Sequence, residues 1–222
     1  RSNYEALKQV KIKELDVDGA VFQVQFNPAR IVSSAAKVDT KSIQERQCFL
    51  CAINRPSVQK SVRFDENYTI LINPFPIFPK HFTIPDNLHQ LQLIAGRFGG
   101  MLALAEAMTE YVIFYNGPKC GASAPDHIHF QAGNKGFLPL ELNWRKYITE
   151  TLTENTGSKL YSIDCAFPAL VIETDNKNDG EMLFEKIYNA LNINEGELEP
   201  MLNILTWFEN EKWIAVIIPR VK

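Results

Sequence analysis

Two histidines separated by one residue are the first candidates for chemistry. The stretch YNGPKCGASAPDHIHFQAG, residues 115–133, places His127, His129 and Gln131 in alternation behind a loop of small residues. In an extended strand, side chains at i, i+2 and i+4 point to one face, at steps of roughly 6.5–7 Å. A neutral imidazole can attack phosphorus or bind a metal ion. The motif therefore predicts a catalytic or a metal site, and a solvent-facing polar strand is the alternative.

The loop before the histidines has a composition that suits phosphate binding. Gly121, Ala122 and Ser123 are small, and Lys119 adds a positive charge. Successive backbone N–H groups in such a loop can form a concave nest for an anion. A small-residue loop is a weak signal by itself, so its value comes from its position directly before the histidines.

Cys48 and Cys51 form a C-x-x-C pair, which supplies half of a tetrahedral metal site. Since the sequence has no second such pair, the remaining ligands must be histidines or carboxylates. The chain has four histidines, at positions 81, 89, 127 and 129. The alternative is a thiol redox pair, but the CFLC stretch is not preceded by a strand that enters a helix, as the redox motif requires.

The elements that must position these residues are strands and amphipathic helices. In the first half, the apolar pattern predicts strands over 20–26, 68–73, 81–85, 111–115 and 127–132. The last two strands are expected to pair antiparallel. Apolar residues spaced three and four apart from Leu91 to Met108 predict a helix, which His89 opens.

The second half repeats a similar order of elements. We predict a helix within 139–153, a strand over 168–174, a helix over 181–191 and a final hairpin around Asn210. Because the chain lacks a regular βαβ rhythm, the expected class is α+β with a mainly antiparallel sheet and packed helices. The repeated order favours a degenerate duplication with halves at 1–135 and 136–222.

Composition narrows the possible partners. The 222 residues are 45% hydrophobic, and 23 basic against 26 acidic residues give a net charge of -3, so no sequence-wide field attracts nucleic acid or an anionic membrane. No apolar run reaches the roughly 20 residues of a membrane span. The charged start, RSNYEALKQVKIKEL, is unlike a signal-peptide core, and four cysteines are too few for a secreted disulfide framework. We therefore expect a cytoplasmic protein.

The sequence contains an ordered set of short motifs: NPAR (27–30), CFLCAINRP (48–56), NPFPIFPKHFTIP (73–85), His89, YNGP (115–118), GASAP (121–125) and HIHFQ (127–131). This set resembles the galactose-1-phosphate uridylyltransferase branch of the histidine-triad (HIT-like) superfamily. This branch includes dinucleoside tetraphosphate phosphorylases and GDP-sugar phosphorylases. The resemblance covers residues 27–131 and depends on the order of the motifs. It implies a HIT-like fold and a nucleotidyltransferase or phosphorylase.

The resemblance also implies roles for individual residues. His129 would be the nucleophile that forms a covalent nucleotidyl-histidine, and Gln131 would bind a non-bridging phosphate oxygen. The substrate would be a nucleoside diphosphate sugar or a dinucleoside polyphosphate, and the acceptor a phosphate or sugar phosphate. The candidate substrate-binding residues, including Lys119 from the loop composition, are Arg30, Asn73, Asn116, Lys119, Gly121 and Ser123. For Asn73, a turn-forming role before Pro74 is the equal alternative.

The resemblance implies a structural zinc, or a similar divalent metal, held by Cys48, Cys51, His89 and His127. It thus divides the two strand histidines between metal and substrate, whereas the residues alone allow both to bind one ion. The chain departs from the family at Asp126, which either shifts the phosphate loop or orients a histidine. A non-catalytic nucleotide-binding or metal-stabilised module of the same fold is the runner-up, and a homodimer is a further hypothesis.

Overall fold

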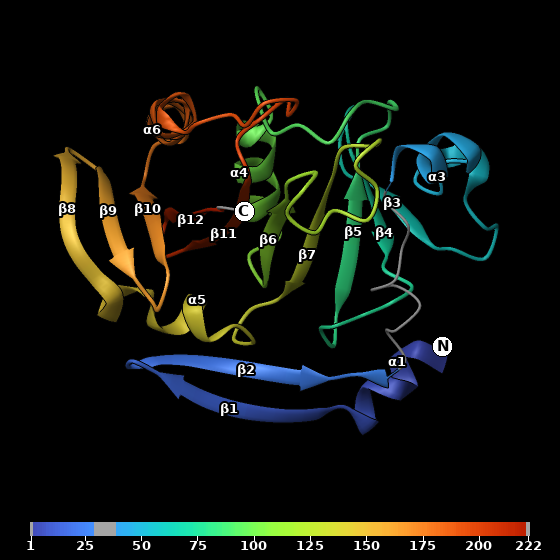
Figure 1. The fold of residues 1–222 in the computed structure, drawn as a ribbon, viewed down its shortest axis with the longest axis horizontal. Helices are drawn as coiled ribbons and strands as arrows, with labels where there is room; N and C mark the ends of the chain where they lie inside the picture. Colours follow the sequence, from blue (N-terminus) through green and yellow to red (C-terminus); the bar gives the residue numbers. More distant parts are fainter. Residues whose placement is uncertain (1, 29–38, 221–222) are drawn as a thin grey trace.

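Ten strands form one antiparallel sheet in the computed structural model, which describes residues 2–28 and 39–220 (Figure 1). The strand order across the sheet is β3-β4-β5-β7-β6-β11-β12-β10-β9-β8. The strands are β3 (Ser61–Arg63), β4 (Thr69–Ile72), β5 (His81–Pro85), β6 (Tyr111–Asn116), β7 (His129–Asn134), β8 (Ile148–Asn155), β9 (Ser158–Asp164), β10 (Pro168–Thr174), β11 (Leu202–Glu209) and β12 (Lys212–Pro219). The mainly antiparallel α+β class predicted from the sequence is confirmed.

The sheet has the same strand order when it is followed inward from either edge. The first half runs β3-β4-β5, then helix α4 (Phe98–Ala107), then β6 and β7. The second half runs β8-β9-β10, then helix α6 (Lys177–Ala190), then β11 and β12. The two halves meet where β6 pairs with β11, from Asn116↔Asn203 to Ile113↔Thr206. The topology is therefore repeated within one continuous sheet.

The two faces of the sheet are covered differently. Helices α4 and α6 lie on one side, over the core that contains Phe130, Ile172 and Phe184. On the opposite side a hairpin of β1 (Lys11–Val17) and β2 (Ala20–Phe26) runs along the molecule with α5 (Pro139–Asn143) (Figure 1). Ala20 and Phe22 of this hairpin pack on a second core around Trp207.

Short-range signals explain the turns and helix ends. Asp18 and Gly19 have φ values of 53° and 82°, and Asn210 and Glu211 have values of 50° and 60°. Two-residue turns with positive φ match the right-handed twist of a hairpin. At the start of α6, the Asn176 side chain accepts hydrogen bonds from two backbone N–H groups of the first turn. The predicted final hairpin around Asn210 is thus confirmed.

The helix predicted from Leu91 begins only at Phe98. Residues 88–94 are not helical, Leu91 is 52% exposed and Gln92 is fully buried. Polar groups of this segment bond to the loop before β7 and to Glu199, as when Ile94 N–H donates to the Glu199 carboxylate at 2.8 Å. These long-range hydrogen bonds replace the helical ones, so the apolar spacing was misleading here.

The helix predicted within 139–153 is confirmed at Pro139–Asn143, whereas the residues from Ile148 on form a strand. Helix α5 and a 3-10 turn (Trp144–Tyr147) end before Ile148, where the long strand β8 starts and pairs with β9. The sequence of β8, ITETLTEN, is rich in β-branched residues, which favour an extended backbone. Two short helices, α1 (Ser2–Ala6) and α3 (Thr40–Glu45), were not predicted. Among the described residues, none of the helices has the length and apolar character that a membrane crossing requires.

Candidate functional site

The central strands β5, β7 and β6 carry the predicted chemistry on the face opposite α4. Phe130 and Ala132 of β7 belong to the core under α4, so His129 and Gln131 point to the other face. On the neighbouring β5, Thr83 lies opposite Gln131. Strand β7 starts at His129 and not at residue 127, which corrects the predicted strand boundary.

Cys48, Cys51, His89 and His127 converge into one cluster. Their candidate ligand atoms all lie within 4.8 Å of one another. The Nδ1 atom of His127 lies 3.3 Å from Sγ of Cys48, and the Nδ1 atom of His89 lies 3.2 Å from Sγ of Cys51. A tetrahedral zinc site with ordinary bond lengths separates nitrogen and sulfur ligands by about 3.5 Å. The donor set and its spacing therefore fit a Cys2His2 metal site.

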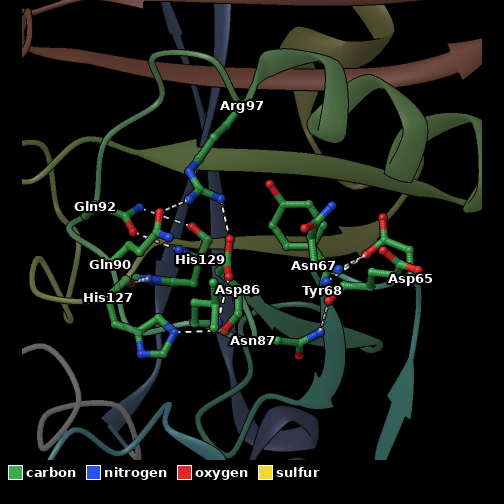
Figure 2. A network of polar contacts seen from close by, with 12 residues as sticks. Asp65, Asn67, Tyr68, Asp86, Asn87, Gln90, Gln92, Arg97, His127 and His129 are labelled. Carbon is green, nitrogen blue, oxygen red and sulfur yellow. Dashed lines mark hydrogen bonds and ion pairs between the residues drawn. The ribbon is translucent and has the colours of Figure 1, made fainter.

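Hydrogen bonding orients the His127 ring toward the thiols. Its Nε2 lies 2.9 Å from the carbonyl oxygen of Asp86, to which it donates, so Nδ1 presents its lone pair to the cysteines. The Asp86 carboxylate accepts from Arg97, which also bonds Gln90 (Figure 2). Burial lowers the pKa of His127, which favours the neutral form that a metal needs.

His129 is separate from this cluster. Its Nδ1 lies 2.8 Å from the carbonyl oxygen of His127, to which it donates a hydrogen bond. The side chain is 3% exposed, and burial lowers the pKa of His129 to about 4, so its ring is neutral near pH 7. Because a neutral imidazole with a protonated Nδ1 keeps a lone pair on Nε2, this nitrogen can act as a nucleophile.

A chain of hydrogen bonds orients the carboxamide of Gln131. The N–H of Ile77 donates to Nδ1 of His81 at 3.2 Å, so a neutral His81 ring carries its proton on Nε2. That Nε2 lies 3.0 Å from Oε1 of Gln131, and Nδ2 of Asn73 lies 3.5 Å from the same oxygen. With Oε1 engaged, the amide group of Gln131 remains a donor.

Asn73 makes the turn-forming contact considered from the sequence and also bonds to neighbouring side chains. Its Oδ1 accepts from the N–H of Phe75 at 2.8 Å, a turn-forming contact, while its Nδ2 donates to Thr83 at 2.9 Å and reaches Gln131. It therefore belongs to the polar face of β5 and β7.

The loop between β6 and β7 lies next to these groups. Its buried Ala122 and Ala124 anchor it, and Gly121 has a φ of 101°, which favours glycine. Within the part of the chain that the structure describes, the N–H groups of Gly121 and Ser123 have no acceptor. The loop can thus offer backbone donors to an anion.

The remaining candidates differ in their surroundings. The Asn116 side chain accepts a hydrogen bond from Asn203 of β11 at 2.7 Å, so the second half of the chain supports the loop. Lys119 is exposed at the loop. Arg30 lies outside the described residues. Asp126 pairs with Arg46, which precedes the C-x-x-C pair, so its carboxylate contacts an arginine and not a histidine.

Several residues of this site carried no sequence signal. Asp86 acts through its backbone carbonyl, and Arg46 lies in a polar stretch without a pattern. Gln92 is fully buried against β7, although it stands in a run that reads as a helix. Its one available signal is its position, a polar residue between the apolar Leu91 and Leu93.

Solved structures resemble this fold. Yeast Ap4A phosphorylase Apa2 matches with a TM-score of 0.53 and 20% identity over 99% of this chain and 76% of that protein. Its complex with AMP gives 0.54 and 20% over 99% and 78%. A DUF4931 family protein from Bacillus cereus gives 0.51 and 17% over 73% and 86%. At these identities the similarity concerns the fold, which is HIT-like.

Sequence comparisons add the family. The search of curated proteins found no match. The profile of one family, described as a domain of unknown function (DUF4922), matches residues 1–134. This range contains the C-x-x-C pair, His89 and the H-x-H-x-Q motif, and it is more than half of the chain. The chain therefore belongs to the DUF4922 family.

Proposed function

We propose that the protein is a nucleotidyltransferase or phosphorylase that works through a covalent nucleotidyl-histidine at His129. The observation that carries this proposal is the state of the His129 ring. Its Nδ1 is engaged by the His127 carbonyl oxygen, its burial keeps it neutral, and it lies outside the metal cluster. A nucleophilic imidazole needs these conditions.

The proposed reaction has two displacements. The Nε2 lone pair of His129 attacks the α-phosphorus of the substrate, the P–N bond forms, and the bond from phosphorus to the leaving phosphate oxygen breaks. The positive charge on the ring is stabilised by the Nδ1–H bond to the His127 carbonyl oxygen. An oxygen of the acceptor phosphate then attacks phosphorus, the P–N bond breaks, and neutral His129 is restored.

The neighbouring groups would bind the phosphates. The amide group of Gln131 would donate to a non-bridging oxygen, where negative charge grows in the transition state. The N–H groups of Gly121 and Ser123, with Lys119, would hold the adjacent phosphate. Asn73 and Asn116 would complete the site, and Arg30 remains a candidate from the family resemblance.

The Cys48, Cys51, His89 and His127 cluster would hold a structural zinc. Two thiolates and two imidazoles are the ligands that tetrahedral zinc prefers. When bound, the ion would supply a cross-link between three segments of the chain. His127 would then be held on the side of the metal, and its carbonyl oxygen would stay in place to accept from His129.

Two observations support the proposed substrate classes. The fold likeness to a protein named Ap4A phosphorylase supports a dinucleoside polyphosphate. The order of the motifs also supports a nucleoside diphosphate sugar, with phosphate or a sugar phosphate as acceptor.

We also propose that residues 1–135 form a catalytic HIT-like half and residues 136–222 a degenerate HIT-like half, which the repeated strand order supports.

A trapping experiment tests the function. The protein is incubated with Ap4A, UDP-glucose or GDP-glucose labelled at the α-phosphorus, and acid-labile label on the protein is measured. We expect an adduct that disappears when phosphate is added and that His129→Ala does not form, while the variant keeps the wild-type metal content. Tight binding of these nucleotides without adduct or turnover would instead favour the non-catalytic module.

A further inference from the structure

Strands β6 and β7 stop pairing at the position of the proposed nucleophile. Their register runs from Tyr111↔Asn134 to Phe114↔Gln131. Continued by two residues, the same register would place Asn116 opposite His129. The side chain of Gln92 bonds to the backbone of both residues at this position instead. Figure 2 shows it beside His129.

The carboxamide of Gln92 replaces the missing pairing. Its Oε1 accepts from the N–H of His129 at 2.8 Å. Its Nε2 donates to the carbonyl oxygens of His129 at 3.1 Å and of Asn116 at 3.0 Å. A carboxamide has the same donor and acceptor groups as a peptide, so it can bond both polar groups of one strand residue.

The backbone around Gln92 is fixed as well. Its N–H donates to the carbonyl oxygen of Pro125 at 3.1 Å, and its own carbonyl oxygen lies 3.1 Å from the hydroxyl of Tyr115. Two residues earlier, the carbonyl oxygen of Gln90 accepts from Ile128 N–H at 2.7 Å. Gln92 is 0% exposed, so the hydrogen bonds that it makes itself form away from water. Gln92 is therefore held in place by hydrogen bonds from its backbone as well as from its carboxamide.

We propose that Gln92 is a positioning residue for the nucleophile, an inference that rests on the proposed function. By bonding both backbone polar groups of His129, it fixes the orientation from which the ring leaves the strand. By keeping Asn116 away from His129, it opens the sheet where the phosphate loop begins. Gln92 lies three residues after His89, so one segment carries both a candidate metal ligand and the proposed positioning residue.

Two variants and a control test this role. Gln92→Met keeps the length of the side chain and removes all three hydrogen bonds. Gln92→Glu keeps the acceptor for the His129 N–H and removes both donors. Gln23→Met is the control, since Gln23 is exposed on β2 and bonds only to Glu14 within the described residues.

The first experiment measures two quantities for each variant: the rate of adduct formation at saturating substrate and the affinity for AMP. A misplacement of about 1 Å can lower a rate about 100-fold, so we expect Gln92→Met to react roughly ten- to 100-fold more slowly and Gln92→Glu to fall between it and wild type. AMP affinity should change far less, and Gln23→Met should match wild type. A wild-type rate in Gln92→Met, or affinity and rate that fall together, would overturn the inference.

The second measurement does not require turnover. In ¹⁵N spectra of the histidine rings, the Nδ1–H form of His129 should give way to a shifted or averaged signal in Gln92→Met and stay unchanged in Gln23→Met. If wild type forms no adduct, the proposed function fails while this spectrum still reports on Gln92. An unchanged His129 signal in Gln92→Met, or in Gln92→Glu if the first variant does not fold, contradicts the positioning role.

Discussion

Replacing His81 by phenylalanine should slow the proposed reaction without touching the nucleophile. The His81 ring stacks on Phe114 with ring centroids 5.9 Å apart and meets the edge of Phe78 at 5.4 Å. A phenyl ring can keep these contacts. It cannot accept from the Ile77 N–H or donate to Oε1 of Gln131. Among the residues that the structure describes, the Gln131 carboxamide then retains only the long contact from Asn73 at 3.5 Å, so it can rotate.

The size of the effect follows from the hydrogen bond that Gln131 would make. A hydrogen bond to a charged group contributes about 1.5–3 kcal/mol, which corresponds to roughly ten- to 150-fold in rate. Gln131→Met removes this bond, whereas His81→Phe only misorients the donor, so its loss should be the smaller of the two. The half-buried N–H of Ile77 loses its acceptor, which should also destabilise the fold by about 0.5–1.5 kcal/mol.

Single-turnover adduct formation separates these effects, because the rate is measured on folded protein while urea unfolding reports the stability. The double variant should react no more slowly than Gln131→Met, since His81 acts through Gln131. Tyr111→Phe, a hydroxyl deletion at the other end of β6, serves as the control. Losses that multiply in the double variant, or a wild-type rate in His81→Phe beside a slow Gln131→Met, would refute the reasoning.

Three further changes probe the metal, a buried acid and the packing beneath the site. Cys48→Ser should lose the one zinc per chain that elemental analysis of wild type is expected to find, and with it thermal stability; two titratable thiols without metal in wild type would support the redox alternative. Burial raises the pKa of Glu199, so the folded state holds its proton after the unfolded chain has released it, and the unfolding free energy should fall as pH rises through that interval. Glu199→Gln should remove this slope in urea titrations across a pH series, and an unchanged slope would contradict it. A Cβ at position 133 would lie 2.4 Å from Phe78, so Gly133→Ala should cost about 1–3 kcal/mol of stability in the same titrations; an unchanged midpoint would contradict the packing.

The parts of the fold that the sequence predicts are those with a regular pattern of apolar residues or a characteristic spacing of functional residues. The strands at 81–85 and 168–174 have the predicted bounds, because β-branched and aromatic residues follow one another between turn residues there. The cysteine pair and two histidines, selected from the order of the motifs, converge within 4.8 Å. Such signals are local or carried by residue type, so a single sequence displays them.

The missed parts depend on contacts between distant segments. The segment at 88–94 has the spacing of a helix, yet hydrogen bonds to Pro125, His129 and Glu199 hold it in another form. Likewise, the role of His81 depends on Gln131, which lies 50 residues later. The periodicity of apolar residues indicates which face of a helix or strand is apolar, but it does not indicate which distant residue a polar side chain will contact.

The structure places the two histidines of the strand in different surroundings, a difference that their spacing does not predict. His127 uses both ring nitrogens, Nε2 toward the Asp86 carbonyl oxygen and Nδ1 toward the cysteines. His129 uses Nδ1 toward the carbonyl oxygen of His127. Among the described residues, Nε2 of His129 has no hydrogen-bond partner, so it is the ring nitrogen of this pair that is available for the proposed attack on phosphorus. Within the part of the chain that the structure describes, the side chains whose ligand atoms lie within 4.8 Å of one another are Cys48, Cys51, His89 and His127. Because His129 is not in this group, the geometry does not favour a single ion shared by both histidines of the strand.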